Sequence, residues 1–286
     1  MVEEIRSTSP AAGTLTPLPL DLTDFASVRS AATSLRTRRL DYLFLNAGMV
    51  YALPPHKHTG PWLTADGYDH LFAANHLGHF LLCHLLLPLL KDTAADRQDR
   101  EGCARSRIIV TSSIAHWLAR PHWLFRRHES FEAAGPLEKF RMYGTSKLAN
   151  LLFAYQLQRN LDEEGAPVDV AVVTPGLVAS EIGNPVRGAR SMIHWLPLAV
   201  APSRGAETAV FAATSKEAAA SRDAFIVPYF APPFSRRWSW AWPSMVGWEL
   251  LQRLSWQPRL SCSSPDSYDA DLAQRLWRFS RQAVGL

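Results

Sequence analysis

Along the chain, runs of apolar residues alternate with segments whose apolar positions recur at helical spacing. The runs predict buried strands at residues 15–20, 40–45, 108–111 and 168–173, and a last one near 224–229. The periodic segments predict helices over 25–35, 67–91, 143–164 and 203–215, and charged residues predict a loop over 92–105. Asp24 is placed to cap the first of these helices. Strands alternating with helices predict an α/β fold with a doubly wound parallel (Rossmann-like) sheet, covered on both faces.

The chain has 286 residues and no linker or repeat that would divide it, so we expect one domain over 1–286. Its net charge is +4, without a block of consecutive basic residues, which argues against nucleic-acid binding. Cys83, Cys103 and Cys262 form no C-x-x-C pair, which suits a reducing compartment and argues against a disulfide framework or a zinc site. The first residues lack the order of a signal peptide, and the apolar run 80–90 is too short to span a bilayer, so we expect a cytoplasmic protein.

A tryptophan-dense stretch with basic flanks lies toward the C-terminus and includes Trp238 and Trp256. Two interpretations of this stretch stay open. Residues of about 230–265 form either a lid that lines an apolar substrate pocket or, over Trp238–Trp256, a contact with a membrane surface. The second interpretation would make the cytoplasmic protein membrane-associated.

Tyr143 and Lys147 are four residues apart in a predicted helix, so both side chains lie on one face. A free tyrosine has a pKa of about 10 and is a poor proton donor or acceptor near neutral pH. A lysine cation close by favours the phenolate and lowers that pKa. The pair therefore predicts a general acid/base.

Small and polar residues follow three predicted strands at the point where each strand ends: Asn46-Ala47-Gly48, Ser112-Ser113 and Thr174-Pro175-Gly176. In an open α/β sheet, ligands bind outside the carboxyl ends of the strands. We expect these residues to meet at one rim, where Tyr143 and Lys147 open the next helix.

These motifs, together with Asn75-His76-Leu77-Gly78-His79-Phe80, resemble the short-chain dehydrogenase/reductase family. The finer match, in residues 75–82, 146–150 and 276–280, is similar to the retinol-dehydrogenase-like branch. The resemblance covers about residues 21–286. It implies an oxidoreductase that transfers a hydride between a nicotinamide cofactor, NADP or NAD, and an alcohol, ketone or aldehyde of an apolar substrate.

The resemblance also implies roles for single residues. Tyr143 would be the general acid/base, Lys147 would lower its pKa and bind the nicotinamide ribose, Ser113 would orient the carbonyl, and Asn75 would support the lysine through water. The implied cofactor-binding residues are Asp21, Asn46, Ala47, Gly48, Tyr143, Lys147, Pro175, Gly176 and Ser180. The family's long helices often pair between subunits, which implies a homodimer through 67–91 and 143–164.

Some of these residues have plainer interpretations. Asp21 is also a residue type that closes turns, and Ser180 is one that caps helices. His70, His76, His79 and His84 share one predicted helix, but no carboxylate completes a ligand set at metal spacing, so we expect no metal site.

The family's glycine-rich turn, G-x-x-x-G-x-G, has no counterpart before Asp21, where the only glycine is Gly13. Such a turn places backbone amides around the cofactor pyrophosphate. We therefore expect an N-terminally incomplete Rossmann-like sheet, and the strand end that would separate NAD from NADP is missing, although the resemblance favours NADP. Three interpretations follow: an incomplete sequence of an active enzyme, a shortened pseudoenzyme acting as a binding or scaffold protein, or a missing unit supplied by another chain.

Overall fold

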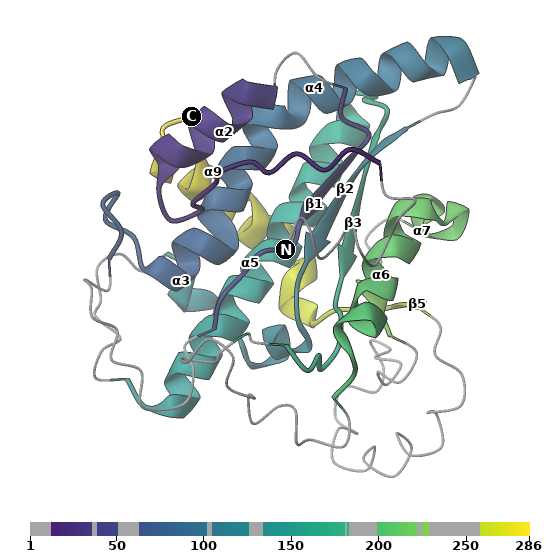
Figure 1. The fold of residues 1–286 in the computed structure, drawn as a ribbon. Helices are drawn as coiled ribbons and strands as arrows, with labels where there is room; N and C mark the ends of the chain where they lie inside the picture. Colours follow the sequence, from purple (N-terminus) through teal and green to yellow (C-terminus); the bar gives the residue numbers. More distant parts are fainter. Residues whose placement is uncertain are drawn as a thin grey trace.

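The computed structural model describes residues 13–35, 39–50, 63–101, 105–125, 134–180, 182, 199–221, 225–228 and 258–286. Its sheet has the strand order β1-β2-β3-β4-β5 (Figure 1). The strands are β1 (Tyr42–Leu45), β2 (Ser106–Thr111), β3 (Val168–Val173), β4 (Phe225–Val227) and β5 (Arg259–Ser261). Neighbours from β1 to β4 are parallel, whereas β5 pairs with β4 in the antiparallel direction. The predicted parallel Rossmann-like sheet is confirmed from β1 to β4, and the antiparallel β5 is an addition that the sequence pattern did not predict.

Helices cover both faces of this sheet. They are α2 (Phe25–Leu35), α3 (His70–Phe72), α4 (Gly78–Glu101), α5 (Pro136–Glu163), α6 (Pro202–Thr214), α7 (Lys216–Ala220) and α9 (Ala270–Ala283). Figure 1 shows α4 and α5 on one side and α6 with α7 on the other, while α2 packs on α4 and α9 packs on α5. In β2, Ile108 and Val110 join the core under α4 and α5, whereas Ile109 packs with the alanines of α6. Side chains alternate between the two faces of a strand, so a strand buried on both faces reads as a continuous apolar run.

The helix predicted over residues 25–35 forms as α2. The side chain of Asp24 accepts a hydrogen bond of 2.9 Å from the backbone N–H of Ala26, which satisfies one of the donors left open at a helix start. The strand predicted at residues 15–20 is wrong, because these residues pair with no strand in the described part of the chain. A segment forms a strand only where a neighbouring strand pairs with its backbone groups. Within the described residues, β1 pairs with β2 alone.

The loop predicted over 92–105 is also wrong for most of its length, since α4 continues to Glu101. Charged residues suggested a loop, but this stretch has no glycine or proline before Gly102 and consists largely of good helix formers. The C-terminal half of α4 packs against the start of β1.

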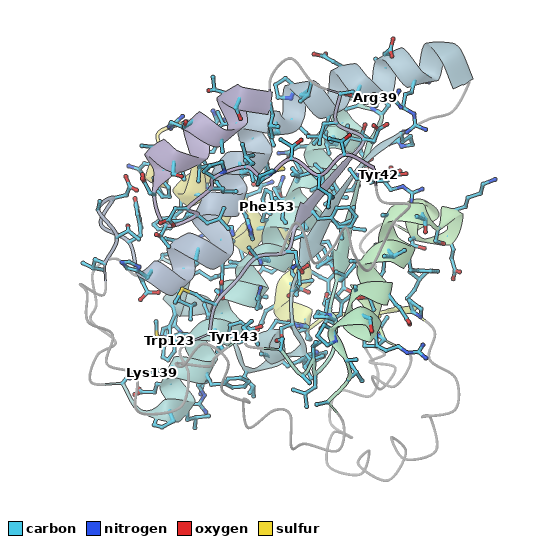
Figure 2. The ribbon with its side chains drawn as sticks, in the orientation of Figure 1. Arg39, Tyr42, Trp123, Lys139, Tyr143 and Phe153 are labelled. Atoms are coloured by element: carbon cyan, nitrogen blue, oxygen red, sulfur yellow. The ribbon has the colours of Figure 1, made fainter. Side chains whose placement is uncertain are left out.

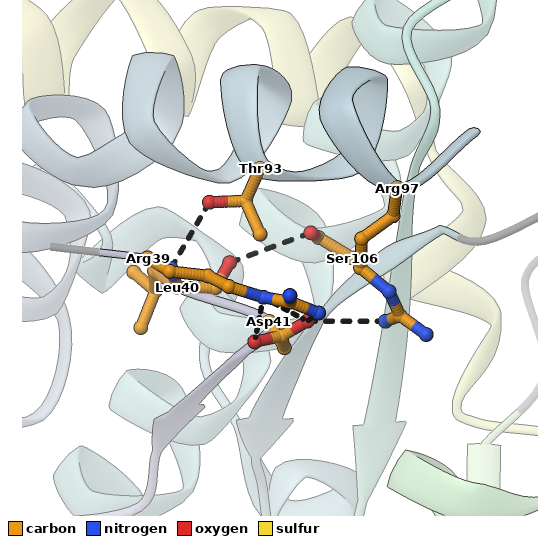
Figure 3. Close-up of polar contacts among 6 residues, drawn as sticks. All are labelled: Arg39, Leu40, Asp41, Thr93, Arg97 and Ser106. Atoms are coloured by element: carbon orange, nitrogen blue, oxygen red, sulfur yellow. Dashed lines mark hydrogen bonds and ion pairs between the residues drawn. The ribbon is translucent and has the colours of Figure 1, made fainter. Parts of the chain in front are cut away.

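Figure 3 shows how that contact is made. The hydroxyl of Thr93 accepts a 3.0 Å hydrogen bond from the backbone N–H of Leu40, and Ser106 donates to the Leu40 carbonyl. Asp41 lies between Arg39 and Arg97, which contact its carboxylate at 2.8 Å and 3.1 Å. The guanidinium groups hold the pKa of Asp41 below its usual value. The end of α4 thereby fixes where β1 begins.

The helix that carries Tyr143 starts at Pro136, seven residues earlier than predicted. Proline is favoured in the first turn of a helix, where its missing N–H costs nothing. Tyr143 therefore lies two turns inside α5 and does not open it. Figure 2 shows Tyr143 and Trp123 near one end of the molecule, away from Arg39 and Tyr42 at the start of the sheet.

The predicted lid, at residues of about 230–265, is described only at its C-terminal end. The tryptophan-rich stretch lies outside the described residues over 229–257, and the end of the range 230–265 forms β5 and the start of the 3₁₀ turn η7 (Pro265–Tyr268).

In the described part, the helical stretch His70–Gln98 is long and apolar enough to cross a membrane by composition, but 72% of its apolar window is buried inside the protein. It serves as the core helix over the sheet.

Candidate active site

The loops that follow the parallel strands meet at one rim of the sheet, as expected. After β1, the side chain of Asn46 accepts a 3.0 Å hydrogen bond from the hydroxyl of Thr111, the last residue of β2. After β2, the backbone N–H of Ser112 donates to the carbonyl of Val173 at the end of β3, 2.8 Å away. The Ser112 hydroxyl donates to the carbonyl of Lys147, also at 2.8 Å, and so connects the rim to α5.

Lys147 is buried, with only 3% of its surface exposed. Its Nζ atom donates to the carbonyl oxygen of Thr111 at 3.2 Å and lies 5.7 Å from the centre of the Tyr143 ring. Burial lowers the pKa of the Lys147 ammonium to about 8, because the charged form loses its hydration. The predicted pairing of the two side chains is present, and the ammonium also contacts the rim of the sheet.

The expected effect of this pairing on Tyr143 is wrong in direction. Burial raises the pKa of the Tyr143 phenol, and a hydrogen bond from Ser113 offsets part of that rise. The physical reason is that desolvation penalises the phenolate, while the ammonium that would favour it is directed at the Thr111 carbonyl. Tyr143 is therefore held as a protonated phenol at neutral pH.

Asn75 is fully buried and lies in a π-helical turn, η1 (Ala73–Leu77), between α3 and α4. Its Nδ2 atom donates to the carbonyl of Met49 and to the hydroxyl of Ser146, both at 2.9 Å, and its Oδ1 atom accepts from the Met49 N–H at 2.7 Å. Single π-helical turns are frequent at functional sites. Asn75 thus fastens the loop after β1 to the helix that carries Tyr143 and Lys147.

Gly48 permits this close approach. A Cβ atom at this position would lie 3.0 Å from Oδ1 of Asn75 and 3.3 Å from Nζ of Lys147. The sequence predicted a small residue here for a ligand, and the structure shows that the two polar side chains already require one.

Ser113 begins the 3₁₀ turn η2 (Ile114–Leu118), and its hydroxyl oxygen accepts a 3.2 Å hydrogen bond from the N–H of Ala115. Gly144 of α5 packs directly on this turn, since a Cβ atom there would lie 2.4 Å from the Ala115 carbonyl oxygen. The neighbouring Thr145 hydroxyl accepts from the N–H of Arg120 at 2.9 Å. This role of Gly144 was not predicted from the sequence, although a glycine inside a predicted helix is a signal of close packing.

The remaining predicted cofactor residues lie at or near the rim. Asn46, Ala47 and Gly48 are exposed, and Pro175, Gly176 and Ser180 are partly exposed after β3. Gly176 has a φ of 76°, a conformation that favours glycine.

Asp21 makes the contact of its plainer interpretation, whereas the residues that would show whether Ser180 caps a helix lie outside the described ranges. The exposed carboxylate of Asp21 accepts from the N–H and hydroxyl of Thr23 at 2.8 Å and 2.7 Å, which closes a turn. The Ser180 hydroxyl accepts from the N–H of Ile182 at 3.5 Å. Both residues make these local contacts within the chain.

The histidines of the core helix serve packing. Burial lowers the pKa of His76 and of His79 to about 3, so both are neutral, and His76 Nε2 lies 2.8 Å from the Ser280 hydroxyl of α9. Within the described ranges, no group of three or more His, Cys, Asp or Glu side chains is placed to hold a metal ion.

The donors at the rim suit one half of a nicotinamide dinucleotide. An ammonium, a phenol and a serine hydroxyl converge beside α5, which is the kind of donor set that a ribose and a carbonyl oxygen require. None of the described helices begins at a turn with two or more glycines, the feature that would hold the pyrophosphate. Lys147, Tyr143 and Ser113 are the residues that would hold the nicotinamide half.

The parallel sheet, its helical layers and this rim define a Rossmann-like α/β protein with a nucleotide-type site. A family model for short chain dehydrogenase matches residues 1–124. A short chain dehydrogenase/reductase of Colletotrichum higginsianum, dpchH, is 34% identical over an alignment of 278 residues, and the match covers 93% of this chain and 60% of that protein. Human retinol dehydrogenase 11 is 36% identical over an alignment of 204 residues, and the match covers 69% of this chain and 55% of that protein. The chain belongs to the short-chain dehydrogenase/reductase family, in its retinol-dehydrogenase-like branch.

Solved structures agree on the fold. An uncharacterized protein from Mycobacterium paratuberculosis matches with a TM-score of 0.58 and 27% identity, covering 93% of this chain and 74% of that one. The NADPH-bound carbonyl reductase from chicken fatty liver matches with a TM-score of 0.52 and 22% identity, covering 79% and 78%. The chain spans 60% of the length of dpchH and 56% of the length of human polyprenol dehydrogenase, another relative, which is 31% identical over 202 residues.

Proposed function

We propose that this protein is an NAD(P)-dependent oxidoreductase in which Tyr143 transfers the proton. The observation that carries the proposal is that the Tyr143 side chain hydrogen-bonds Ser113 and lies with its ring centre 5.7 Å from the ammonium of Lys147. A bound nicotinamide would supply or accept the hydride. The residues of the chain would orient the carbonyl oxygen and move its proton.

The protonation state of Tyr143 favours reduction of a carbonyl. A phenol is protonated at neutral pH and burial raises its pKa further, so the resting group carries the proton that reduction of a carbonyl requires. Ser113 would hold the substrate oxygen beside Tyr143, since its hydroxyl oxygen accepts from the Ala115 N–H and its side chain hydrogen-bonds the phenol. Lys147, whose pKa is about 8, would remain largely protonated and stabilise negative charge that develops as the proton leaves.

The surroundings of Tyr143 support an apolar substrate. The Phe140 ring lies 6.0 Å from the Tyr143 ring and is 41% exposed, one helical turn earlier on α5. On η2, which packs against the same helix, Ile114 and Leu118 are 36% and 43% exposed. Exposed apolar side chains of this size around polar groups are typical of a binding surface.

Purified protein, incubated with NADPH or NADH and a panel of apolar and polar aldehydes and ketones, tests this proposal. We expect oxidation of the cofactor with apolar carbonyl compounds and measurable cofactor binding by calorimetry. Absence of both turnover and binding at millimolar cofactor would refute the proposal for this chain. Turnover of polar carbonyl compounds alone would refute the assigned substrate class. The cofactor preference, a homodimer through α4 and α5, a single domain over 1–286 and a lid or membrane contact by the tryptophan-rich stretch stay predictions.

A further inference from the structure

His116 of η2 is a buried side chain that the proposed reaction does not use, and both of its ring nitrogens have partners. Its Nδ1 atom lies 2.6 Å from the carbonyl oxygen of Ser113, and its Nε2 atom lies 2.9 Å from the backbone nitrogen of Ser264. A backbone N–H only donates, so Nε2 is the acceptor and carries no hydrogen. The hydrogen of the neutral ring is therefore on Nδ1 and is donated to Ser113.

The surroundings keep the ring in this state. His116 is 1% exposed, and its ring meets the Phe225 ring of β4 edge-on at 5.2 Å. Burial lowers the pKa of His116 to about 4, because the imidazolium would lose its hydration. The ring is neutral through the whole physiological range.

The partner of His116 on the C-terminal side is itself fixed by buried hydroxyls. Ser267 donates to the carbonyl of Ser264 at 2.6 Å and lies 2.6 Å from the hydroxyl of Ser263, which lies 2.9 Å from the phenol of Tyr155. The three serines are each at most 3% exposed. Tyr155 belongs to α5, three turns after Tyr143. The series of contacts therefore runs from Tyr143 to Ser113, which precedes η2, and returns to α5 at Tyr155.

We propose that His116 is a positioning residue that holds Ser113 against Tyr143. The Ser113 carbonyl accepts from His116 twice, from Nδ1 at 2.6 Å and from the backbone N–H at 3.1 Å. These two bonds fix the orientation of the peptide that carries the Ser113 side chain, and Ser264 anchors the ring on its far side. This inference rests on the proposed function for its catalytic meaning, but its geometric content is separate from turnover.

A pair of variants isolates the bond to Ser113. His116→Asn keeps an amide N–H near the position of Nδ1 and loses the acceptor for Ser264, whereas His116→Leu loses both at similar volume. The probe is the NMR resonance of the Tyr143 Cζ atom in protein labelled at its tyrosines. Tyr143→Phe assigns this resonance, and Ser113→Ala gives the shift expected when the Ser113 hydroxyl is lost.

We expect His116→Leu to move the Tyr143 resonance in the direction and by the amount that Ser113→Ala does, and His116→Asn to leave it near the wild-type position. A wild-type position in His116→Leu overturns the proposal, as does a Tyr143 resonance that Ser113→Ala leaves unmoved. Equal movement in His116→Asn and His116→Leu also overturns it, because the donor to Ser113 would then be irrelevant.

Kinetics give the second measurement. We expect kcat to fall about tenfold or more in His116→Leu and to stay within about threefold in His116→Asn, with cofactor affinity unchanged in both. A lower kcat of equal size in both variants contradicts the assignment. If the wild-type protein turns nothing over, the proposed function fails, while the tyrosine resonance still decides the role of His116.

Discussion

Gly144 lies against the carbonyl oxygen of Ala115, and a Cβ atom at residue 144 would approach that oxygen to 2.4 Å. The contact joins α5, the helix that carries Tyr143, to the turn that begins at Ser113. Because backbone atoms stand on both sides, neither can yield by rotating a side chain. The close packing of α5 on η2 therefore depends on the absence of a side chain at residue 144.

We predict that Gly144→Ala separates η2 from α5. Overpacking at a backbone contact costs about 1–3 kcal/mol of unfolding free energy. The displaced Ser113 would also reduce turnover. Urea unfolding and steady-state kinetics measure the two effects, with Gly135→Ala as control, since nothing lies within 4 Å of a Cβ at Gly135. Equal stability of the two variants would contradict this account of the contact.

Arg107 of β2 caps the C-terminal end of α6 from the face of the sheet that α6 covers. Its Nη1 atom donates to the carbonyls of Ala212, Ala213 and Ser215 at 3.0 Å, 2.9 Å and 2.8 Å. We predict that Arg107→Met lowers the unfolding free energy by about 2–4 kcal/mol, because partly buried carbonyls lose a charged donor. Arg204→Met is the control and should cost at most about 0.5 kcal/mol, since Arg204 pairs with Glu207 on the surface. Loss of the same size in both variants would be evidence against the cap.

Acid should destabilise the protein before its carboxylates are protonated. His76 and His79 have folded-state pKa values of about 3, lowered by burial, whereas unfolded histidine titrates near about 6.5. Below about pH 6.5 the unfolded chain therefore binds protons that the folded chain does not. Their contribution to stability is fully present above that pH and declines as the pH falls toward 3, by up to about 1.4 kcal/mol per pH unit for each residue.

His76→Gln checks this sign. We expect the variant to lose less unfolding free energy than wild type between pH 7 and pH 5, with a slope lower by about one proton. Urea unfolding at several pH values in this range gives the slope. Parallel pH profiles of the two proteins would mean that His76 does not titrate on unfolding.

The sequence predicted the fold where local pattern decides it. The helix 25–35 and the strand 168–173 appear at the predicted residues, because apolar periodicity and an N-cap at Asp24 are local signals. The prediction of a strand at 15–20 was wrong, since a strand depends on a neighbouring strand that the local sequence pattern does not show. The prediction of a loop in place of the end of α4 was wrong because that end is held by contacts with Leu40 and Asp41, which lie more than fifty residues earlier in the chain.

The candidate site was predictable as a set of residues but not as a geometry. Asn75, Ser113, Tyr143 and Lys147 stood out through motif spacing, and they lie together at the rim. The bond between His116 and Ser264 spans 148 residues and joins elements with no shared pattern. The rise in the pKa of Tyr143 follows from burial, which the spacing of Tyr143 and Lys147 alone did not reveal.

Turnover by Tyr143→Phe, compared with wild type at equal cofactor saturation, tests the central claim most directly. The change removes one hydroxyl and keeps the ring that packs beside Phe140. We expect kcat to fall by at least about 100-fold while the dissociation constant for the cofactor changes by no more than about threefold. A Phe variant that keeps a kcat within about threefold of wild type would contradict the assignment of Tyr143 as the proton donor.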